Sequence, residues 1–197
     1  IELHLDNLTP SDRNSTNELE IRFGTKGIKN ISKIDFMNVV SKLKSLNYNT
    51  SYGSEQGVHS LKIQSEFIDP KSGVTKTSNV RVEINGLGAI KKYCNSNSIK
   101  ENLKSEQGFN NNLSLMTKKN IKDKDGFDIR PVDVNSFNFR ISYQQETKIN
   151  MGSQFAKSVL SEIDDVKKMY RLVNRVSFTH PSFPIRVDLS IVKSSTY

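Results

Sequence analysis

The sequence predicts an α+β domain in which helices pack on the outside of an antiparallel sheet. Several segments alternate charged and apolar residues with a period of two, which is typical of strands with two different faces. Other segments carry apolar residues at helical spacing behind a serine that can cap the helix. Short turns rich in proline and serine join neighbouring strands, which favours antiparallel pairing. The 197 residues suit one domain.

The alternating segments give the positions of the predicted strands. The first covers residues 18–23, Glu-Leu-Glu-Ile-Arg-Phe, and ends at Gly24. Further strands are predicted at residues 80–84, 113–116, 137–143, 169–178 and 185–192, with hairpin strands between residues 48 and 77. Residues 180–184, His-Pro-Ser-Phe-Pro, form the hairpin turn between the last two strands.

The clearest helix signal covers residues 32–46. Ser32 can cap this helix, and Asp35 three residues later completes a capping box. Its apolar stripe, which includes Met37 and Leu43, is expected to pack against the outside of the sheet. Shorter helices are predicted at residues 89–94 and 98–104, and residues 155–165 as a loop with a helical turn.

Composition excludes several classes of protein. The single cysteine, Cys94, rules out an internal disulfide framework and is expected to be a buried small apolar residue. The three histidines lie far apart, without zinc-site spacing. No apolar run approaches the roughly 18 residues that a membrane span needs, so no membrane partner is expected.

The net charge of +8 indicates an anionic partner, with nucleic acid or polyphosphate first. Many of the 29 lysines and arginines are scattered, and a basic surface in a lysine- and asparagine-rich protein would give the same total. The arginines carry more information because they lie inside the strand patterns.

Each alternating strand separates charged from apolar residues. The charged faces carry Glu18, Glu20, Arg22, Arg81, Glu83, Arg140, Ser142, Arg171, Arg175, Ser177, Arg186, Asp188 and Ser190. Two arrangements fit this pattern. In an open antiparallel sheet the charged face meets water. In a closed barrel it lines the interior, where charges persist only if they pair with one another or hold a ligand.

The charged residues have the chemistry of metal-assisted phosphate hydrolysis. Glu18 and Glu20 lie on one side of a strand, about 7 Å apart along it, and their carboxylates suit a hard divalent cation. Arginine presents a planar fork that matches phosphate oxygens. A bound divalent cation neutralises phosphate charge and generates or orients a nucleophilic water. The alternative is that the arginines pair with the acids Glu18, Glu20, Glu83 and Asp188 for structural reasons only.

Several segments carry a family resemblance in the same order along the chain. Residues 17–24, Asn-Glu-Leu-Glu-Ile-Arg-Phe-Gly, resemble the first strand of the triphosphate tunnel metalloenzymes. Residues 170–178 and 186–195, with Arg-Val-Asp-Leu-Ser followed by Val-Lys-Ser-Ser, resemble the paired late strands of that family. Residues 80–82 and 140–146 resemble two middle strands. The resemblance is most specific to the RNA 5′-triphosphatase domain of mRNA capping enzymes of large DNA viruses, which is related to the fungal and poxvirus triphosphatases.

The resemblance implies a fold and a set of functional residues. The fold is a closed antiparallel β-barrel of about eight strands, a triphosphate tunnel with helices packed outside. Glu18 and Glu20 would bind Mg²⁺ or Mn²⁺. Glu146 would orient the attacking water, and Asp188 would fix the arginines or a metal-bound water. Arg175 would hold phosphate and is counted with Glu146 and Asp188 among the catalytic residues. The implied phosphate contacts come from Arg81, Lys118, Arg140, Arg171, Arg186 and Ser190.

Two departures from the family pattern stand out. Val173 lies where relatives often have lysine. The family's second Glu-x-Glu strand follows the Lys-Ser-Ser segment, and this sequence ends at Tyr197. We therefore expect residues 1–197 to be a single tunnel domain and a fragment of a longer multifunctional chain.

The resemblance implies a polynucleotide 5′-phosphatase, a hydrolase acting on phosphoric anhydrides. It would remove the γ-phosphate of 5′-triphosphate RNA in a metal-dependent reaction, as the first step of mRNA capping. Expected partners are triphosphate-ended RNA and a fused or associated guanylyltransferase and methyltransferase. The protein would be virus-encoded and act in the host cytoplasm or the virion. Two alternatives stay open: a non-catalytic tunnel domain that binds RNA or polyphosphate, and a tunnel enzyme acting on inorganic polyphosphate or nucleoside triphosphates.

Overall fold

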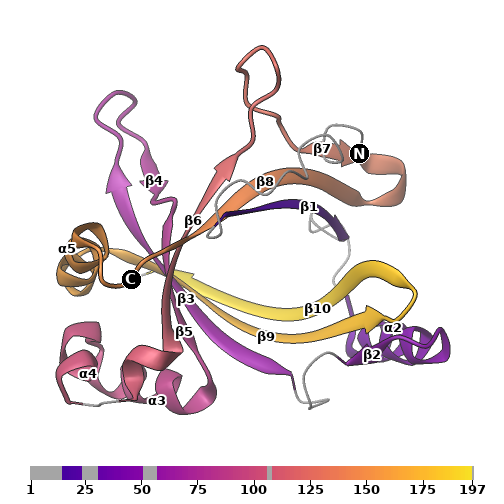
Figure 1. Cartoon of the computed structure of the whole chain (residues 1–197), viewed down its shortest axis with the longest axis horizontal. Coiled ribbons are helices and arrows are strands. Elements are labelled where there is room, and N and C mark those ends of the chain that lie inside the picture. The colour runs from indigo at the N-terminus through magenta and orange to yellow at the C-terminus, as the bar shows by residue number, and fades with distance from the viewer. Residues whose placement is uncertain (1–14, 24–30, 51–56, 106–107, 197) are drawn as a thin grey trace. The chain divides into compact units, whose positions relative to one another are not determined.

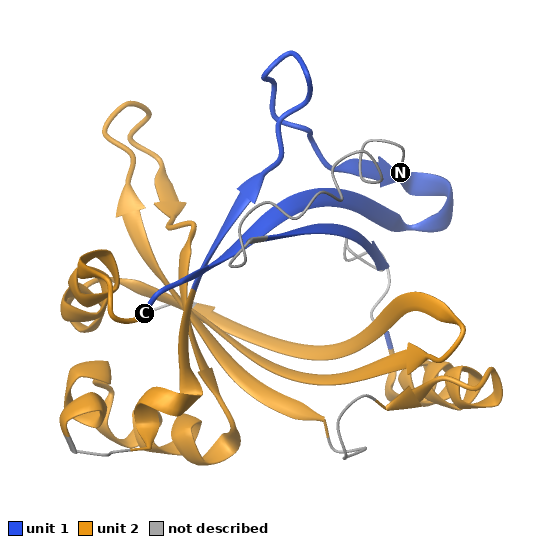
Figure 2. Cartoon of the chain, in the orientation of Figure 1, with its two compact units in different colours: residues 1–31, 116–150 blue, residues 32–115, 151–197 orange. Residues whose placement is uncertain are grey.

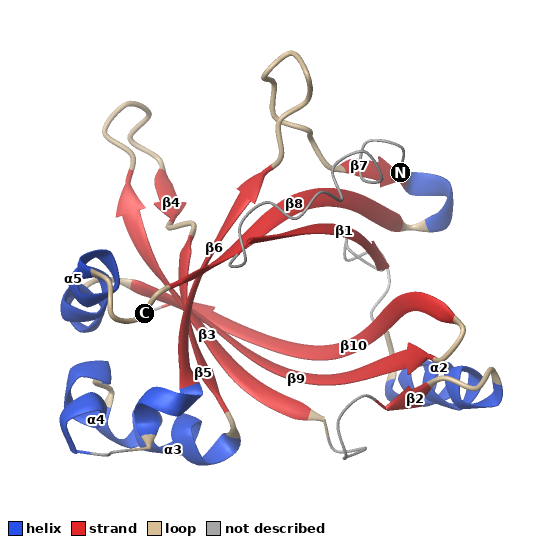
Figure 3. Ribbon diagram, viewed as in Figure 1, coloured by secondary structure: helices blue, strands red, loops and turns tan. Residues whose placement is uncertain are grey.

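A computed structural model describes residues 15–23, 31–50, 57–105 and 108–196. Figure 3 colours the strands and helices separately. The strands are β1 (Ser15–Phe23), β2 (Asn49–Thr50), β3 (Val58–Ile68), β4 (Thr75–Thr77), β5 (Val80–Asn85), β6 (Leu113–Asn120), β7 (Val132–Val134), β8 (Phe139–Ile149), β9 (Lys168–His180) and β10 (Phe183–Thr196). The α-helices are α2 (Lys33–Ser45), α3 (Leu87–Ser96), α4 (Ile99–Ser105) and α5 (Gln154–Glu162) (Figure 1). Gly24, the predicted end of the first strand, lies outside the described residues.

The strands follow the order β1-β8-β6-β5-β3-β9-β10, with β7 on β8, β4 on β3 and β2 on β9. In the described residues no pairing joins β1 to β10, the two ends of this order, so the sheet is open. The predicted closed barrel is therefore wrong, although the α+β class and the antiparallel sheet are confirmed. Closure requires a hydrogen-bonded partner for each outer strand, and periodicity within a strand carries no information about that partner.

Residue contacts divide the chain into two compact units, which Figure 2 colours separately. Unit 1 comprises residues 1–31 and 116–150, and unit 2 comprises residues 32–115 and 151–197. In the described part of the chain, no helix is both long and apolar enough to cross a membrane.

Unit 1 is built on the antiparallel pair β1 and β8. Their register places Glu18 opposite Gln144 and Glu20 opposite Ser142. The intervening residues pair apolar with apolar, as in Ile21 opposite Ile141. Because successive side chains point to opposite faces, one face of this pair is charged and the other apolar, as the sequence predicts.

Unit 2 has a two-faced sheet whose apolar side is covered at β3 and β5 by helix α3. Ile63 of β3 lies opposite Val82 of β5, and both side chains are buried. Helix α3 packs on β3 and β5 and contributes the buried Ile90 and Tyr93. Helices α3, α4 and α5 gather on one side of this unit (Figure 1). Burial of this apolar face stabilises the sheet and leaves its other face free for charged residues.

Three local expectations about helices meet different outcomes. The capping box of Ser32 and Asp35 is confirmed, with the Ser32 hydroxyl accepting from the Asp35 backbone N–H. The stripe of α2 is not packed as expected, because Leu43 is its one buried residue while Met37 is exposed. Cys94 is exposed, so its predicted burial is wrong. It follows Tyr93, which takes the buried position on α3.

Helix α5 is longer than the predicted helical turn, and the residues after it anchor another helix. Asp164, in the short 3₁₀ turn Ile163–Asp165, accepts hydrogen bonds at the start of α4. Its donors are the Ser98 hydroxyl at 2.8 Å, the Ile99 N–H at 2.9 Å and the Lys100 N–H at 3.0 Å. A carboxylate on otherwise unpaired N-terminal N–H groups stabilises a helix.

Replacing Asp164 with alanine should lower the free energy of unfolding by about 2–3 kcal/mol, since three hydrogen bonds to a charged group are lost. Urea unfolding measures this change. Asp165→Ala is the matched control, because Asp165 is 73% exposed and pairs with Lys100 at the surface. Such a pair contributes only about 0–1 kcal/mol. Equal losses in the two variants would contradict the anchoring role of Asp164.

Candidate functional site

The charged face of unit 1 brings together three of the predicted acids. Thr16 lies opposite Glu146, Glu18 opposite Gln144 and Glu20 opposite Ser142. Glu18 and Glu20 of β1 and Glu146 of β8 therefore share one face, and all three are half-buried. The Glu-x-Glu spacing on one strand and the register of its neighbour together produce this carboxylate cluster.

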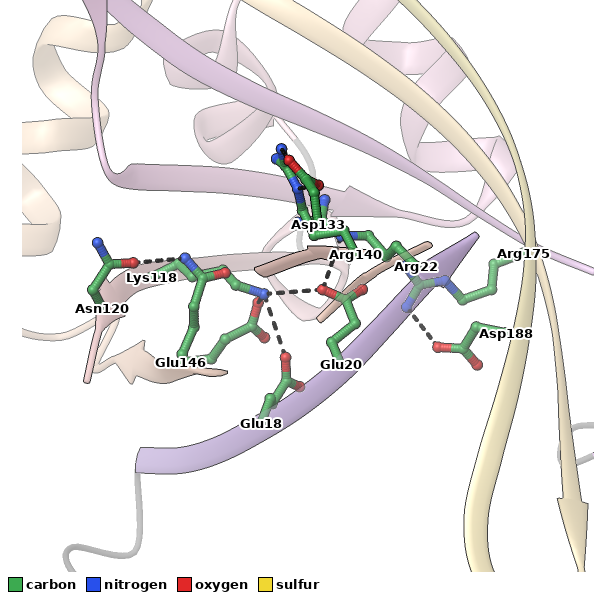
Figure 4. Close-up of polar contacts among 11 residues, drawn as sticks. Glu18, Glu20, Arg22, Lys118, Asn120, Asp133, Arg140, Glu146, Arg175 and Asp188 are labelled. Atoms are coloured by element: carbon green, nitrogen blue, oxygen red, sulfur yellow. Dashed lines mark hydrogen bonds and ion pairs between the residues drawn. The ribbon is translucent and has the colours of Figure 1, made fainter. Parts of the chain in front are cut away.

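Lys118 of β6 lies at the centre of the carboxylate cluster (Figure 4). Its Nζ is 3.2 Å from Glu146 Oε1, 3.5 Å from Glu18 Oε2 and 4.0 Å from Glu20 Oε2. A protonated lysine has three N–H donors, so a single ammonium can serve three acceptors. The contacts place Lys118, predicted to bind phosphate, with the predicted metal ligands.

Two arginines on the same face also have acidic partners. Arg22 Nε lies 3.4 Å from Glu20 Oε2. Arg140 makes a two-pronged contact with Asp133 of β7, through Nε at 2.7 Å and Nη2 at 2.9 Å. The hydrogen bond to Asp133 raises the pKa of Arg140. Arg140, predicted to contact phosphate, is thus held by a carboxylate in this structure.

The donor chemistry of the cluster fits a hard divalent cation, but the positions of the acids are those of an ion-pair network. Carboxylate oxygens are the ligands that Mg²⁺ and Mn²⁺ prefer. The Ser142 hydroxyl beside Glu20 is buried and has no hydrogen-bond partner in the described part of the chain, so a further polar group fits there. No three acids, histidines or cysteines of the described residues are grouped closely enough to hold a metal ion. Lys118 occupies the centre instead.

The polar face of unit 2 carries a second cluster, in which one acid lies among bases. Lys62 of β3 lies opposite Glu83 of β5 and opposite Arg171 of β9. Glu83 Oε1 is 2.6 Å from Arg81 Nε and 3.3 Å from Lys62 Nζ. The side chains of Lys62, Arg81 and Glu83 are each 16% exposed or less. Burial in particular, and also the charges of Arg81 and Arg175, lower the pKa of Lys62, while Glu83 acts in the opposite direction.

Strands β9 and β10 continue this basic face. Arg175 lies opposite Ser190 and donates to its hydroxyl through Nε at 3.1 Å. Its Nη1 is 3.2 Å from Asp188 Oδ2, a contact drawn in Figure 4. The other oxygen of Asp188 lies 3.1 Å from Arg186 Nε. Asp188 therefore contacts two arginines at once, one through each carboxylate oxygen.

The predicted residues fall into one cluster in each unit. Unit 1 holds Glu18, Glu20, Lys118, Arg140 and Glu146; unit 2 holds Arg81, Arg171, Arg175, Arg186, Asp188 and Ser190. Arg171 shares the face of Arg175 but is exposed. The five bases Lys62, Arg81, Arg171, Arg175 and Arg186 outnumber the three acids Glu66, Glu83 and Asp188 on the unit 2 face. This excess favours binding of an anion.

Lys62 is the residue that sequence reasoning missed. Its strand reads His-Ser-Leu-Lys-Ile-Gln-Ser-Glu over residues 59–66, with polar residues at the even positions flanking the buried Leu61 and Ile63. This alternation in the sequence predicts that Lys62 lies on the polar face of its strand. Its partner Glu83 could not be named, because the pairing of β3 with β5 is a tertiary property.

Comparison with known proteins finds a similar solved structure. No protein-family model and no curated protein sequence matches the chain. The solved structure of the Mimivirus capping enzyme triphosphatase is similar to it, with a TM-score of 0.58 and 18% sequence identity. The match covers 98% of this chain and 76% of the Mimivirus chain. This chain has the fold of a viral capping-enzyme triphosphatase. The predicted resemblance to viral triphosphatase tunnel domains is thereby confirmed at the level of the fold.

The Lys62 environment leads to a prediction about stability. Burial and the charges of Arg81 and Arg175 disfavour the charged form of Lys62, so Lys62→Met should leave the free energy of unfolding unchanged or raise it. Glu83 keeps Arg81 as its partner in the variant. Because the pKa of Lys62 is lowered on folding, the wild-type protein gains stability as pH rises from that lowered pKa towards 10.5. Urea unfolding should show the advantage of the variant shrinking over that interval.

The same variant should bind tripolyphosphate about tenfold more weakly, since a charge-assisted hydrogen bond contributes roughly 1.5–3 kcal/mol. Calorimetric titration without metal measures this change. Lys91→Met is the control, because it removes the same charge from an exposed position of α3. Equal weakening in both variants would show that Lys62 acts only through net charge.

Proposed function

We propose that this protein is a metal-dependent RNA 5′-triphosphatase, which hydrolyses the γ-phosphate of 5′-triphosphate RNA as the first step of mRNA capping. The observation that carries the proposal is the convergence of Glu18, Glu20 and Glu146 around one cation, Lys118, on one sheet face. The basic face of unit 2 and the fold shared with a viral triphosphatase support it.

Under this proposal Glu18 and Glu20 hold Mg²⁺ or Mn²⁺. The bound cation would neutralise phosphate charge and lower the pKa of a water molecule. Glu146, on the neighbouring strand, accepts a hydrogen bond from the attacking water and orients it. The second acid pair of the family would complete the ligand set, because the described residues supply no complete one.

The residues of unit 2 hold the triphosphate in this proposal. Arg175 and Arg186 contact phosphate oxygens. Asp188 restrains both guanidinium groups beforehand, so little side-chain conformational entropy is lost on binding. Arg81 and Lys62 add charge from β5 and β3. Ser190 orients Arg175 and offers a hydroxyl, while Arg171 is placed for the more exposed part of the substrate.

We also propose the partners and the cellular location that the family resemblance implies. The substrate is triphosphate-ended RNA, and the product, a diphosphate end, is consumed by a fused or associated guanylyltransferase and then a methyltransferase. The protein is virus-encoded and acts in the host cytoplasm or the virion.

One observation favours a second candidate, a non-catalytic module that binds RNA or polyphosphate. The basic face is complete within the described residues, whereas the carboxylate cluster is organised around a lysine and not around a metal. A phosphate-binding module needs only the basic face. An enzyme acting on inorganic polyphosphate or nucleotides would use the same residues as the RNA enzyme.

Release of inorganic phosphate separates these candidates. Triphosphate-ended RNA, tripolyphosphate and ATP are each incubated with the protein, with and without Mn²⁺. The proposal predicts Mn²⁺-dependent release from RNA, and it predicts that Glu20→Gln lowers the rate by about 100-fold or more, the cost of losing an electrostatic group at the reacting centre. Glu162→Gln, at an exposed position of α5, should retain the wild-type rate.

Each outcome of this assay favours one of the three candidate functions over the others. Release from tripolyphosphate or ATP but not from RNA would favour the small-substrate enzyme. Binding of triphosphate-ended RNA without release would favour the binding module. A Glu20→Gln variant with full activity would overturn the assigned role of the Glu-x-Glu pair.

A further inference from the structure

The charge balance of the carboxylate cluster gives Lys118 a second role. Three carboxylates of like charge lie around the Lys118 ammonium, and Arg22 Nε lies 3.4 Å from one of them, Glu20. The five groups together carry one negative charge when all are ionised, three from the acids less two from the bases. The cluster is half-buried, which strengthens the repulsion among the acids relative to water. Lys118 reduces this repulsion without removing it.

Lys118 also occupies the position that a cation shared by these three acids would take. Its Nζ is within 4.0 Å of oxygens from Glu18, Glu20 and Glu146 at once. A divalent cation held by the same oxygens would need that position, and two cations cannot share it. Displacement would need only rotation about the bonds of the four-carbon stem that carries the lysine charge.

We propose that Lys118 is a resident counter-cation of the carboxylate cluster and that a divalent cation binds only by displacing it. This inference rests on the proposed function, since it concerns the same acids. It assigns Lys118 a positioning role: the lysine keeps the acids together before the metal arrives and weakens metal binding by competing for them. Once displaced, the ammonium is available to a phosphate oxygen.

The test is the affinity of the whole chain for Mn²⁺ alone, measured from the signal of free Mn²⁺ in electron paramagnetic resonance. Lys118→Gln removes the competing charge and should bind Mn²⁺ about tenfold more tightly than the wild-type protein, which corresponds to about 1.4 kcal/mol. Lys119→Gln is the matched control. It makes the same charge change at the next residue of β6, which is exposed and points to the other face, so its affinity should stay at the wild-type value.

Thermal unfolding gives a readout independent of metal affinity. Without metal, Lys118→Gln should melt several degrees below the wild-type protein, because the carboxylates lose their shared partner. Saturating Mn²⁺ should raise the melting temperature of the variant more than that of the wild-type protein, since the cation replaces the missing charge. Lys119→Gln should show neither effect.

The outcomes separate this inference from the proposed function. If the wild-type protein binds Mn²⁺, Glu20→Gln does not, and Lys118→Gln binds no more tightly than the wild type, the metal site stands and the competition is overturned. If neither the wild-type protein nor Lys118→Gln binds Mn²⁺, both the inference and the proposed metal site fall. Tighter binding by Lys118→Gln that is lost again in the double variant with Glu20→Gln supports both.

Discussion

Alternating strands place like charges on one face of a sheet. The fold depends on residues of opposite charge that offset the repulsion between them. A strand reading Glu-Leu-Glu-Ile-Arg puts its apolar residues on one side only by crowding its charged residues on the other. In unit 1 that crowding is relieved by Lys118, which touches Glu18, Glu20 and Glu146. Without such a partner, half-buried carboxylates would oppose the folding that the apolar face drives.

In both clusters a residue of opposite charge reduces the repulsion between like charges, but the signs are reversed between the two units. In unit 1 one base lies among three acids, and in unit 2 Glu83 lies within 3.3 Å of two bases, Arg81 and Lys62. Neither central residue neutralises its surroundings, so the acids keep a negative excess and the bases a positive one. A divalent cation complements the first excess, and a chain of phosphates complements the second. Their internal partners therefore stabilise each cluster while leaving it able to bind a ligand.

The alternation of charged and apolar residues within a strand predicts which side chains share a face. The contacts between strands could not be predicted, because they depend on how the strands pair. The period of two correctly placed Glu18 with Glu20 on one face of β1, because the faces of a single strand follow from sequence alone. The contacts of Lys118 required the register of three strands, which no single segment encodes. The open sheet was missed for the same reason. Helix α2 shows the opposite failure: its stripe predicts burial, yet of that helix only Leu43 is buried.

The cost of the acids bears on the choice between enzyme and binding module. A site that only grips phosphates gains nothing from three carboxylates on one face, since each repels an anionic ligand and costs desolvation when half-buried. A site that must hold a cation and orient water has a use for all three. The presence of Glu146 beside the Glu-x-Glu pair is therefore better accounted for by hydrolysis than by binding. The 18% identity to the Mimivirus protein shows only the fold, so the charges of the site decide between the two functions.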